Sequence, residues 1–349
     1  MTISNSTVTE HVWALPGALS RLQPEACGLL VALNERVWQV SDPVLLELVR
    51  VRVSQLIGNP AAARVRCSYA AVADGAGGAG GPGGGRLEAK LGALPDYPGS
   101  PLFSAAERDV VAFSEQFVID VGGTTEDMRA GLAGRFGADG ARALVTAIYV
   151  VEFTQRLQLI AGRLLDDAEV PADGAGVLAD GAGVLADGAE VSPEGLLNAY
   201  QAAVMRGSAL DPVTTELVRL RCARTHHCRI CQTLRLADAR AAGVDEAMTA
   251  KVDFYERSDL PERAKVALRV TDAFITQPGL LSDAVAEQAR EWFGLAELAS
   301  LGLNITKWST QKIKVALGTD GADRLVTDAD GVALFGFDQA GQVTGYRRR

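Results

Sequence analysis

The chain repeats itself, and this repeat constrains the fold more than any other feature of the sequence. The run DPVLLELVRVR at residues 42–52 returns as DPVTTELVRLR at residues 211–221. Shorter matches lie in the same order on either side of it: GLL at 28–30 and 195–197, then TQ at 154–155 and 310–311. Matches in one order over so long a stretch predict two copies of one structural unit.

Within each copy the apolar residues follow the period of an α-helix. Asp211 followed by Pro212 is typical of an N-cap and the first helical position, and an apolar stripe follows it. We expect this helix to end near Arg224. Pro261 opens another helix-period segment, and residues 295–317 continue the pattern. The fold class predicted is all-α, with two tandem helical domains.

Composition divides the chain further. Residues 166–192 are rich in Gly, Ala and Asp, which predicts a flexible linker between copies at 1–165 and 193–320. Residues 74–85 are rich in glycine and form an insertion in the first copy. They contain a GxGxxG spacing, but no strand-like run precedes it, so we expect no cofactor loop. In the tail, 321–349, apolar runs flank a turn and predict a short β-hairpin.

Charge and length exclude several classes of protein. The net charge of −9 argues against nucleic-acid binding, which needs a positive surface. The longest apolar run, at residues 143–151, is shorter than the roughly 20 residues that span a membrane. The first residues are polar and do not resemble a signal peptide. We therefore expect a cytoplasmic protein that binds neither nucleic acid nor membranes.

Cys228 and Cys231 form the one Cys-x-x-Cys pair of the sequence. In a reducing compartment this pair indicates metal or redox chemistry rather than a disulfide framework. The repeat locates the pair in the fold, because Asn59-Pro60 follows Glu47 at the distance at which Cys228 follows Glu216. Asn followed by Pro is typical of a helix start. Three other cysteines stand alone in apolar or helical contexts and predict small buried side chains: Cys27, Cys67 and Cys222.

By analogy with Asn59, Cys228 is an N-cap and Cys231 the third residue of a helix. Both sulfurs then face unpaired backbone N–H groups, which lowers a thiol pKa. Nearby arginines in the sequence add positive charge: Arg224, Arg229 and Arg235. A thiolate beside a second thiol can attack a peroxide, become a sulfenic acid and be resolved as a disulfide.

Glu-x11-Cys-x-x-Cys, followed by a helix and Ala-Gly-Val at 242–244, resembles the alkylhydroperoxidase D and carboxymuconolactone decarboxylase family. The resemblance implies an all-helical, oligomeric protein that reduces hydroperoxides and is recharged by a dithiol or lipoyl-type protein. It implies that Cys231 attacks the peroxide, Cys228 resolves the product and Glu216 belongs to a proton relay. It implies no bound cofactor or metal ion.

The sequence departs from this family at one position. The family motif ends with a histidine four residues after the second cysteine, and Arg235 stands there. Arginine stabilises a thiolate but cannot shuttle a proton near pH 7. The neighbouring His227 or His226 is the candidate for that transfer. Glu216 also has a structural alternative, because the first copy keeps Glu47 without the cysteines.

Three hypotheses remain open. The first is an oxidoreductase acting on hydroperoxides, and the second is a non-enzymatic redox sensor or scaffold. The third is a metal-binding module built from the adjacent histidines and cysteines, although neighbouring histidines rarely converge on one tetrahedral ion. The family's decarboxylases do not depend on a cysteine pair, so we do not expect that activity. The first copy, with Asn59 and Ala62 at the cysteine positions, is predicted to be catalytically silent and to act as a built-in partner.

Overall fold

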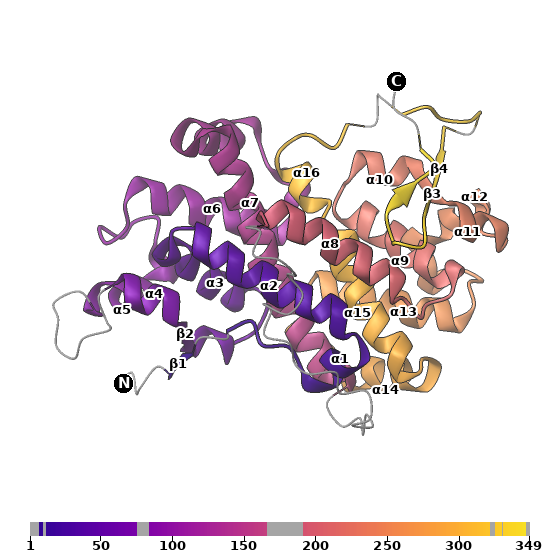
Figure 1. The fold of residues 1–349 in the computed structure, drawn as a ribbon, viewed down its shortest axis with the longest axis horizontal. Helices are drawn as coiled ribbons and strands as arrows, with labels where there is room; N and C mark the ends of the chain where they lie inside the picture. The colour runs from indigo at the N-terminus through magenta and orange to yellow at the C-terminus, as the bar shows by residue number, and fades with distance from the viewer. Residues whose placement is uncertain are drawn as a thin grey trace.

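The computed structural model describes residues 7–9, 12–74, 84–165, 191–321, 325–329 and 331–346, and most of them are helical (Figure 1). The all-α prediction is confirmed. The α-helices of the first copy are α1 Gly17–Leu22, α2 Pro24–Val40, α3 Pro43–Leu56, α4 Ser68–Ala73, α5 Gly84–Gly92, α6 Ala105–Ile119 and α7 Glu126–Leu165. Those of the second are α8 Pro193–Arg206, α9 Pro212–Thr225, α10 Arg229–Thr233, α11 Ala237–Ala241, α12 Glu246–Ala250, α13 Glu262–Ile275, α14 Asp283–Trp292, α15 Leu295–Ser309 and α16 Lys312–Ala316. Short 3-10 helices join them: η1 Ala62–Arg64, η2 Leu94–Asp96, η3 Val121–Gly123, η6 Lys251–Arg257 and η7 Pro278–Leu280.

The repeated runs occupy equivalent helices, α3 and α9. Each begins with an aspartate N-cap followed by proline. Asp42 accepts hydrogen bonds from the backbone N–H groups of α3, and Asp211 accepts one from the N–H of Thr214. Helix α9 ends at Thr225, one residue beyond the expected end. Most of the glycine insertion and of the predicted linker, at residues 75–83 and 166–190, lies outside the described residues.

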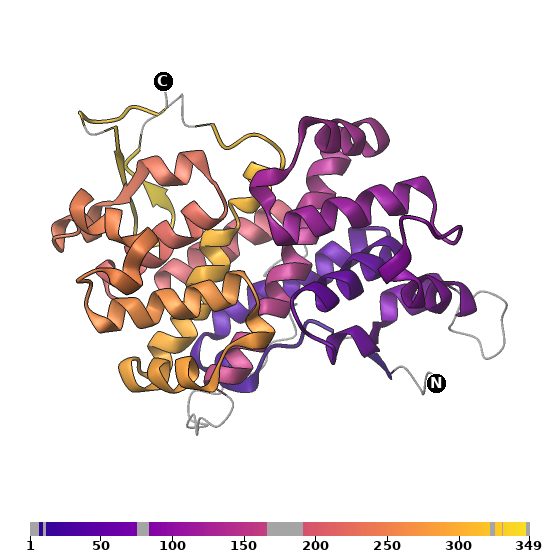
Figure 2. The same cartoon turned by 180° about the vertical axis from the view of Figure 1, so that it is seen from behind.

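Helices of the two copies pack directly against one another. Helix α2 lies against α8, and α7 lies against α15 and α16 (Figures 1 and 2). One cluster of buried apolar side chains runs through both copies. The predicted domain boundaries stay a prediction, because the two copies share this core.

Helix α7 is kinked at Gly137, and its part from Val145 on is mostly buried. Of the helices described, it is the one whose length and hydropathy would suit a membrane span. Within its apolar window, 78% is buried inside the protein, which is the environment of a core helix.

The tail forms the predicted hairpin and also pairs with a strand next to the cysteines. Strands β4 Ala333–Phe337 and β5 Val343–Thr344 pair in antiparallel fashion, which confirms the hairpin. Strand β4 also pairs in parallel with β3 Leu234–Leu236, directly after the cysteine helix. In the first copy, β2 Val65–Cys67 pairs in parallel with the N-terminal strand β1 Thr7–Thr9. The sequence did not predict these parallel pairs, because their partners lie far apart in the chain.

Candidate redox site

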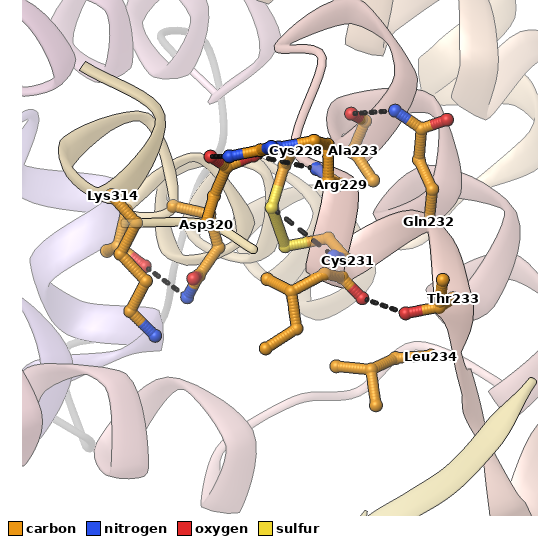
Figure 3. Close-up of a disulfide and its surroundings, with 12 residues drawn as sticks. Ala223, Cys228, Arg229, Cys231, Gln232, Thr233, Leu234, Lys314 and Asp320 are labelled. Carbon is orange, nitrogen blue, oxygen red and sulfur yellow. Dashed lines mark hydrogen bonds and ion pairs between the residues drawn. A yellow bond between two sulfur atoms is a disulfide. The ribbon is translucent and has the colours of Figure 1, made fainter. Parts of the chain in front are cut away.

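Cys228 is the N-cap of α10, and Cys231 is the third residue of that helix. The predicted position of the pair is therefore confirmed. The Cys228 Sγ accepts a hydrogen bond from the backbone N–H of Cys231 at 3.3 Å. The two cysteines are joined as a disulfide, with Cα atoms 5.3 Å apart (Figure 3). This separation lies within the usual range for disulfides.

The turn before Cys228 is built the same way in both copies. The Cys228 N–H donates to the Ala223 carbonyl at 2.9 Å, and the Asn59 N–H donates to the Ser54 carbonyl at 2.8 Å. The Asn59 Oδ1 then accepts from the Ala62 N–H at 3.1 Å, as the Cys228 sulfur accepts from its own helix. The first copy thus keeps the hydrogen bonds of this turn without its sulfurs. The helix start expected at Asn59-Pro60 is wrong for the first copy itself, where the 3-10 helix η1 begins at Ala62, after Ala61.

Glu216 is buried and holds the side chain of Arg219. The Arg219 Nε and Nη2 donate to the two carboxylate oxygens at 2.6 and 2.8 Å. The same guanidinium donates to the carbonyl of Cys231 at 2.8 Å and to that of Leu234 at 2.5 Å. The pair therefore ties the cysteine segment to α9.

The first copy contains the same device. Arg50 donates to both carboxylate oxygens of Glu47 at 2.7 Å. It also donates to the carbonyls of Ala62 and Val65, which occupy the positions of Cys231 and Leu234. A contact kept where the sulfurs are absent supports a structural role for Glu216. Its part in a proton relay stays a prediction.

The arginines near the cysteines all have carboxylate partners. Arg235 donates to Glu246 at 3.0 and 2.7 Å, and this hydrogen bonding holds the pKa of Glu246 below its usual value. Arg224 lies 3.0 Å from Asp253. In the first copy, Arg66 pairs with a glutamate in the same way as Arg235. These partners offset much of the positive charge that the sequence places near the sulfurs.

Asp320 binds the start of α10, and no motif in the sequence predicts this contact. Its carboxylate accepts from the backbone N–H of Arg229 at 2.9 Å and from the guanidinium at 2.8 Å, and its carbonyl accepts from the Ile230 N–H (Figure 3). Burial raises the pKa of Asp320, but the hydrogen bonds from Arg229 outweigh it, so the pKa lies below its usual value.

The two histidines before Cys228 differ in their surroundings. His226 is buried, and its Nε2 lies 3.0 Å from the Ser309 Oγ. Burial, together with nearby Lys312 and Arg156, holds the pKa of His226 well below its usual value. His227 is exposed, and a Cβ on Gly122 would lie 2.9 Å from its side chain. Proton transfer by His227 stays a prediction.

A cavity of about 520 Å³ lies beside Cys231. Its walls come from both copies and from the C-terminal hairpin. Cys231 lines the cavity, whereas Cys228 is fully buried and does not. The predicted site residues His227, Arg235 and Glu216 do not line it either. Of the two cysteines, Cys231 is therefore the one that borders the cavity.

The metal hypothesis finds no cluster to support it. In the described residues, no group of three or more His, Cys, Asp or Glu side chains is arranged to hold a metal ion.

Comparison with known proteins places the chain in a family. The model of the carboxymuconolactone decarboxylase family matches residues 194–252, which include Glu216 and both cysteines. Two uncharacterized proteins of Mycobacterium tuberculosis, MT2376 of strain CDC 1551 / Oshkosh and Rv2313c of strain ATCC 25618 / H37Rv, are each 34% identical over 243 residues. Each alignment covers 67% of this chain and 82% of the relative. The chain belongs to the carboxymuconolactone decarboxylase family. No solved structure gives a significant match.

Proposed function

We propose that this family member is a thiol-dependent oxidoreductase that reduces hydroperoxides through Cys228 and Cys231. The observation that carries the proposal is the placement of the pair. Cys231 lines a cavity, and the Cys228 sulfur lies within bonding reach of the Cys231 sulfur. A peroxide in the cavity can react with Cys231, and the oxidised Cys231 sulfur can then react with Cys228.

The chemistry balances with these two thiols and a dithiol donor. The Cys231 thiolate attacks the outer oxygen of the hydroperoxide, so an S–O bond forms, the O–O bond breaks and an alcohol leaves. The Cys228 thiol then attacks the sulfenic sulfur and releases water as the disulfide forms. A cytoplasmic dithiol or lipoyl-type protein returns the pair to the reduced state by thiol–disulfide exchange.

Backbone contacts support this cycle. The N–H of Cys231 donates to the Cys228 sulfur, a contact that would favour negative charge on this sulfur once the disulfide is opened. A sulfur that carries charge readily is a good leaving group, so reduction by an incoming thiol is favoured. The Arg219 side chain, paired with Glu216, binds the carbonyl of Cys231 and so ties the cysteine segment to α9.

Thiol titration of the reduced protein tests the proposal. One equivalent of cumene hydroperoxide should consume two thiols and lower the intact mass by two hydrogens. Cys231→Ser should abolish disulfide formation, while Cys67→Ser, at a buried cysteine of the first copy, should behave like the wild type. Unchanged thiol content after peroxide addition would refute the proposal.

A redox sensor is the second candidate, and one observation favours it. The cysteine segment is attached to the C-terminal tail through the β3–β4 pair and through Asp320. Through these contacts, a change in the cysteine segment when the disulfide opens would alter the position of the tail. Oxidation of the pair by peroxide without turnover on any dithiol donor would select this candidate.

A further inference from the structure

Lys307 is a buried lysine that has no acidic partner. It lies on α15, is 5% exposed and lines the cavity that Cys231 lines. Within the described part of the chain, no oxygen accepts a hydrogen bond from its Nζ, and no carboxylate lies within ion-pair distance of it. The buried lysines Lys90 and Lys312, by contrast, each bind a glutamate. An unpaired buried ammonium is costly, so a lysine at such a position needs an explanation.

Aromatic rings enclose the amine at the cavity wall. Its Nζ lies 3.0 Å from the ring centroid of Trp308 and 4.5 Å from that of Phe337. Phe335, 5.7 Å from Phe337, carries the Arg219 guanidinium on its face at 5.5 Å. Arg219 in turn donates to the carbonyl of Cys231. One aromatic cluster thus holds Lys307 on the same wall as the cysteine segment.

Lys307 is one of the residues that differ between the two copies. Aligning residues 154–155 with 310–311 places Val151 at its position in the first copy. The Glu–Arg pair and the turn are present in both copies, whereas the lysine occurs only in the copy that carries the cysteines. A residue that accompanies the sulfurs is better explained by their chemistry than by the fold.

We propose that Lys307 is the proton acceptor and donor for Cys231 during hydroperoxide reduction. The inference rests on the proposed function. It supplies a proton-transfer group for the reaction, a role that Arg235, at the position of the family's histidine, cannot perform. Burial and the nearby charge of Arg219 hold the pKa of Lys307 well below its usual range, which favours the neutral amine. A neutral amine can accept a thiol proton, as lysines with lowered pKa do elsewhere in catalysis.

The proton follows a closed path. The Lys307 amine takes the proton of the Cys231 thiol, and the thiolate attacks the outer peroxide oxygen. The departing alkoxide takes the proton back from the Lys307 ammonium and leaves as the alcohol. The later attack of Cys228 on the sulfenic acid releases water and does not need the amine. The remaining titratable side chains that line the cavity are Arg142, Glu194, Arg219, Lys314 and Tyr346.

The test compares reduced wild type with Lys307→Met, which keeps side-chain length and removes the amine. The rate of disulfide formation with cumene hydroperoxide at pH 7 should fall about 100-fold, as is typical for loss of a general base. The melting temperature should not fall, because the variant removes a buried polar group that has no partner. Lys251→Met, at a half-exposed surface lysine, is the control for loss of one positive charge and should keep the wild-type rate.

Two further measurements separate proton transfer from structure. The pKa of the Cys231 thiol, measured by alkylation rate against pH, should rise in Lys307→Met. In Lys307→Ala, added methylamine should restore part of the rate, which a structural role would not allow. A Lys307→Met rate equal to that of a reactive wild type overturns the role of Lys307 and leaves the proposed function intact. A wild type that does not react with hydroperoxide overturns both.

Discussion

Replacing Glu216 by glutamine separates a structural carboxylate from a catalytic one, because the first copy supplies a matched control in Glu47→Gln. Both carboxylates are buried and bind an arginine three residues further along. In each copy that arginine also holds two carbonyls of the following segment. The structural account predicts that the two substitutions destabilise the protein to a similar degree.

The expected magnitude follows from the burial of the pair. Removing one partner of a buried ion pair costs about 3–5 kcal/mol, because a buried charge is left uncompensated. Unfolding entropy of about 2.1 cal/mol/K per residue gives about 0.7 kcal/mol/K for a chain of 349 residues. The melting temperature should therefore fall by about 4–7 °C in either variant.

Differential scanning calorimetry and a thiol-oxidation assay, run well below both melting temperatures, make the comparison. Glu216→Gln and Glu47→Gln should both melt early, and both should keep the wild-type rate of disulfide formation with hydroperoxide. Loss of oxidation in Glu216→Gln at an unchanged melting temperature would refute the structural reasoning and assign the carboxylate to a proton relay.

Three other predictions follow from the geometry. Burial raises the pKa of the three lone thiols, Cys27, Cys67 and Cys222, to about 11 or 12. Iodoacetamide at pH 8 should therefore leave them unlabelled in the folded, reduced protein, and peptide mapping checks this. His227 has a φ of 56°, where the first copy has Gly58 at 75°. His227→Gly should keep stability, whereas Gly58→Ala should cost about 1 kcal/mol or more in a denaturant titration. The pKa of Glu246 is depressed, so its ion pair with Arg235 stabilises the fold above about pH 4.5 and is lost as pH falls through the folded value. Acid titration of Glu246→Gln should therefore show a smaller loss of stability than the wild type, and equal losses would contradict this reading.

Local features of the site were predictable because the repeat acts as an internal alignment. The N-cap position of Cys228 follows from Asn59-Pro60 in the other copy, and the structure confirms it. The helix starts at Asp42 and Asp211 follow from their own side chains and the prolines after them. These features depend on residues within one turn of the chain, so sequence reasoning reaches them.

The surroundings of the cysteines were not predictable in the same way. Asp320 and strand β4 reach the cysteine segment from about a hundred residues away, and no local pattern marks them. Two sequence features bear on this site. Lys307 is a charged residue in an apolar helix where the first copy has valine, and the first copy has Arg66 at the position of Arg235, where it pairs with a glutamate.

The central claim is that Cys231 is the sulfur that meets the peroxide, and trapping of its oxidised form tests this most directly. In Cys228→Ser the sulfenic acid has no resolving thiol, so dimedone should capture it when hydroperoxide is added. The account predicts one dimedone adduct, located by peptide mass spectrometry on Cys231. An adduct on another cysteine, or none while the wild type still forms its disulfide, would contradict the account.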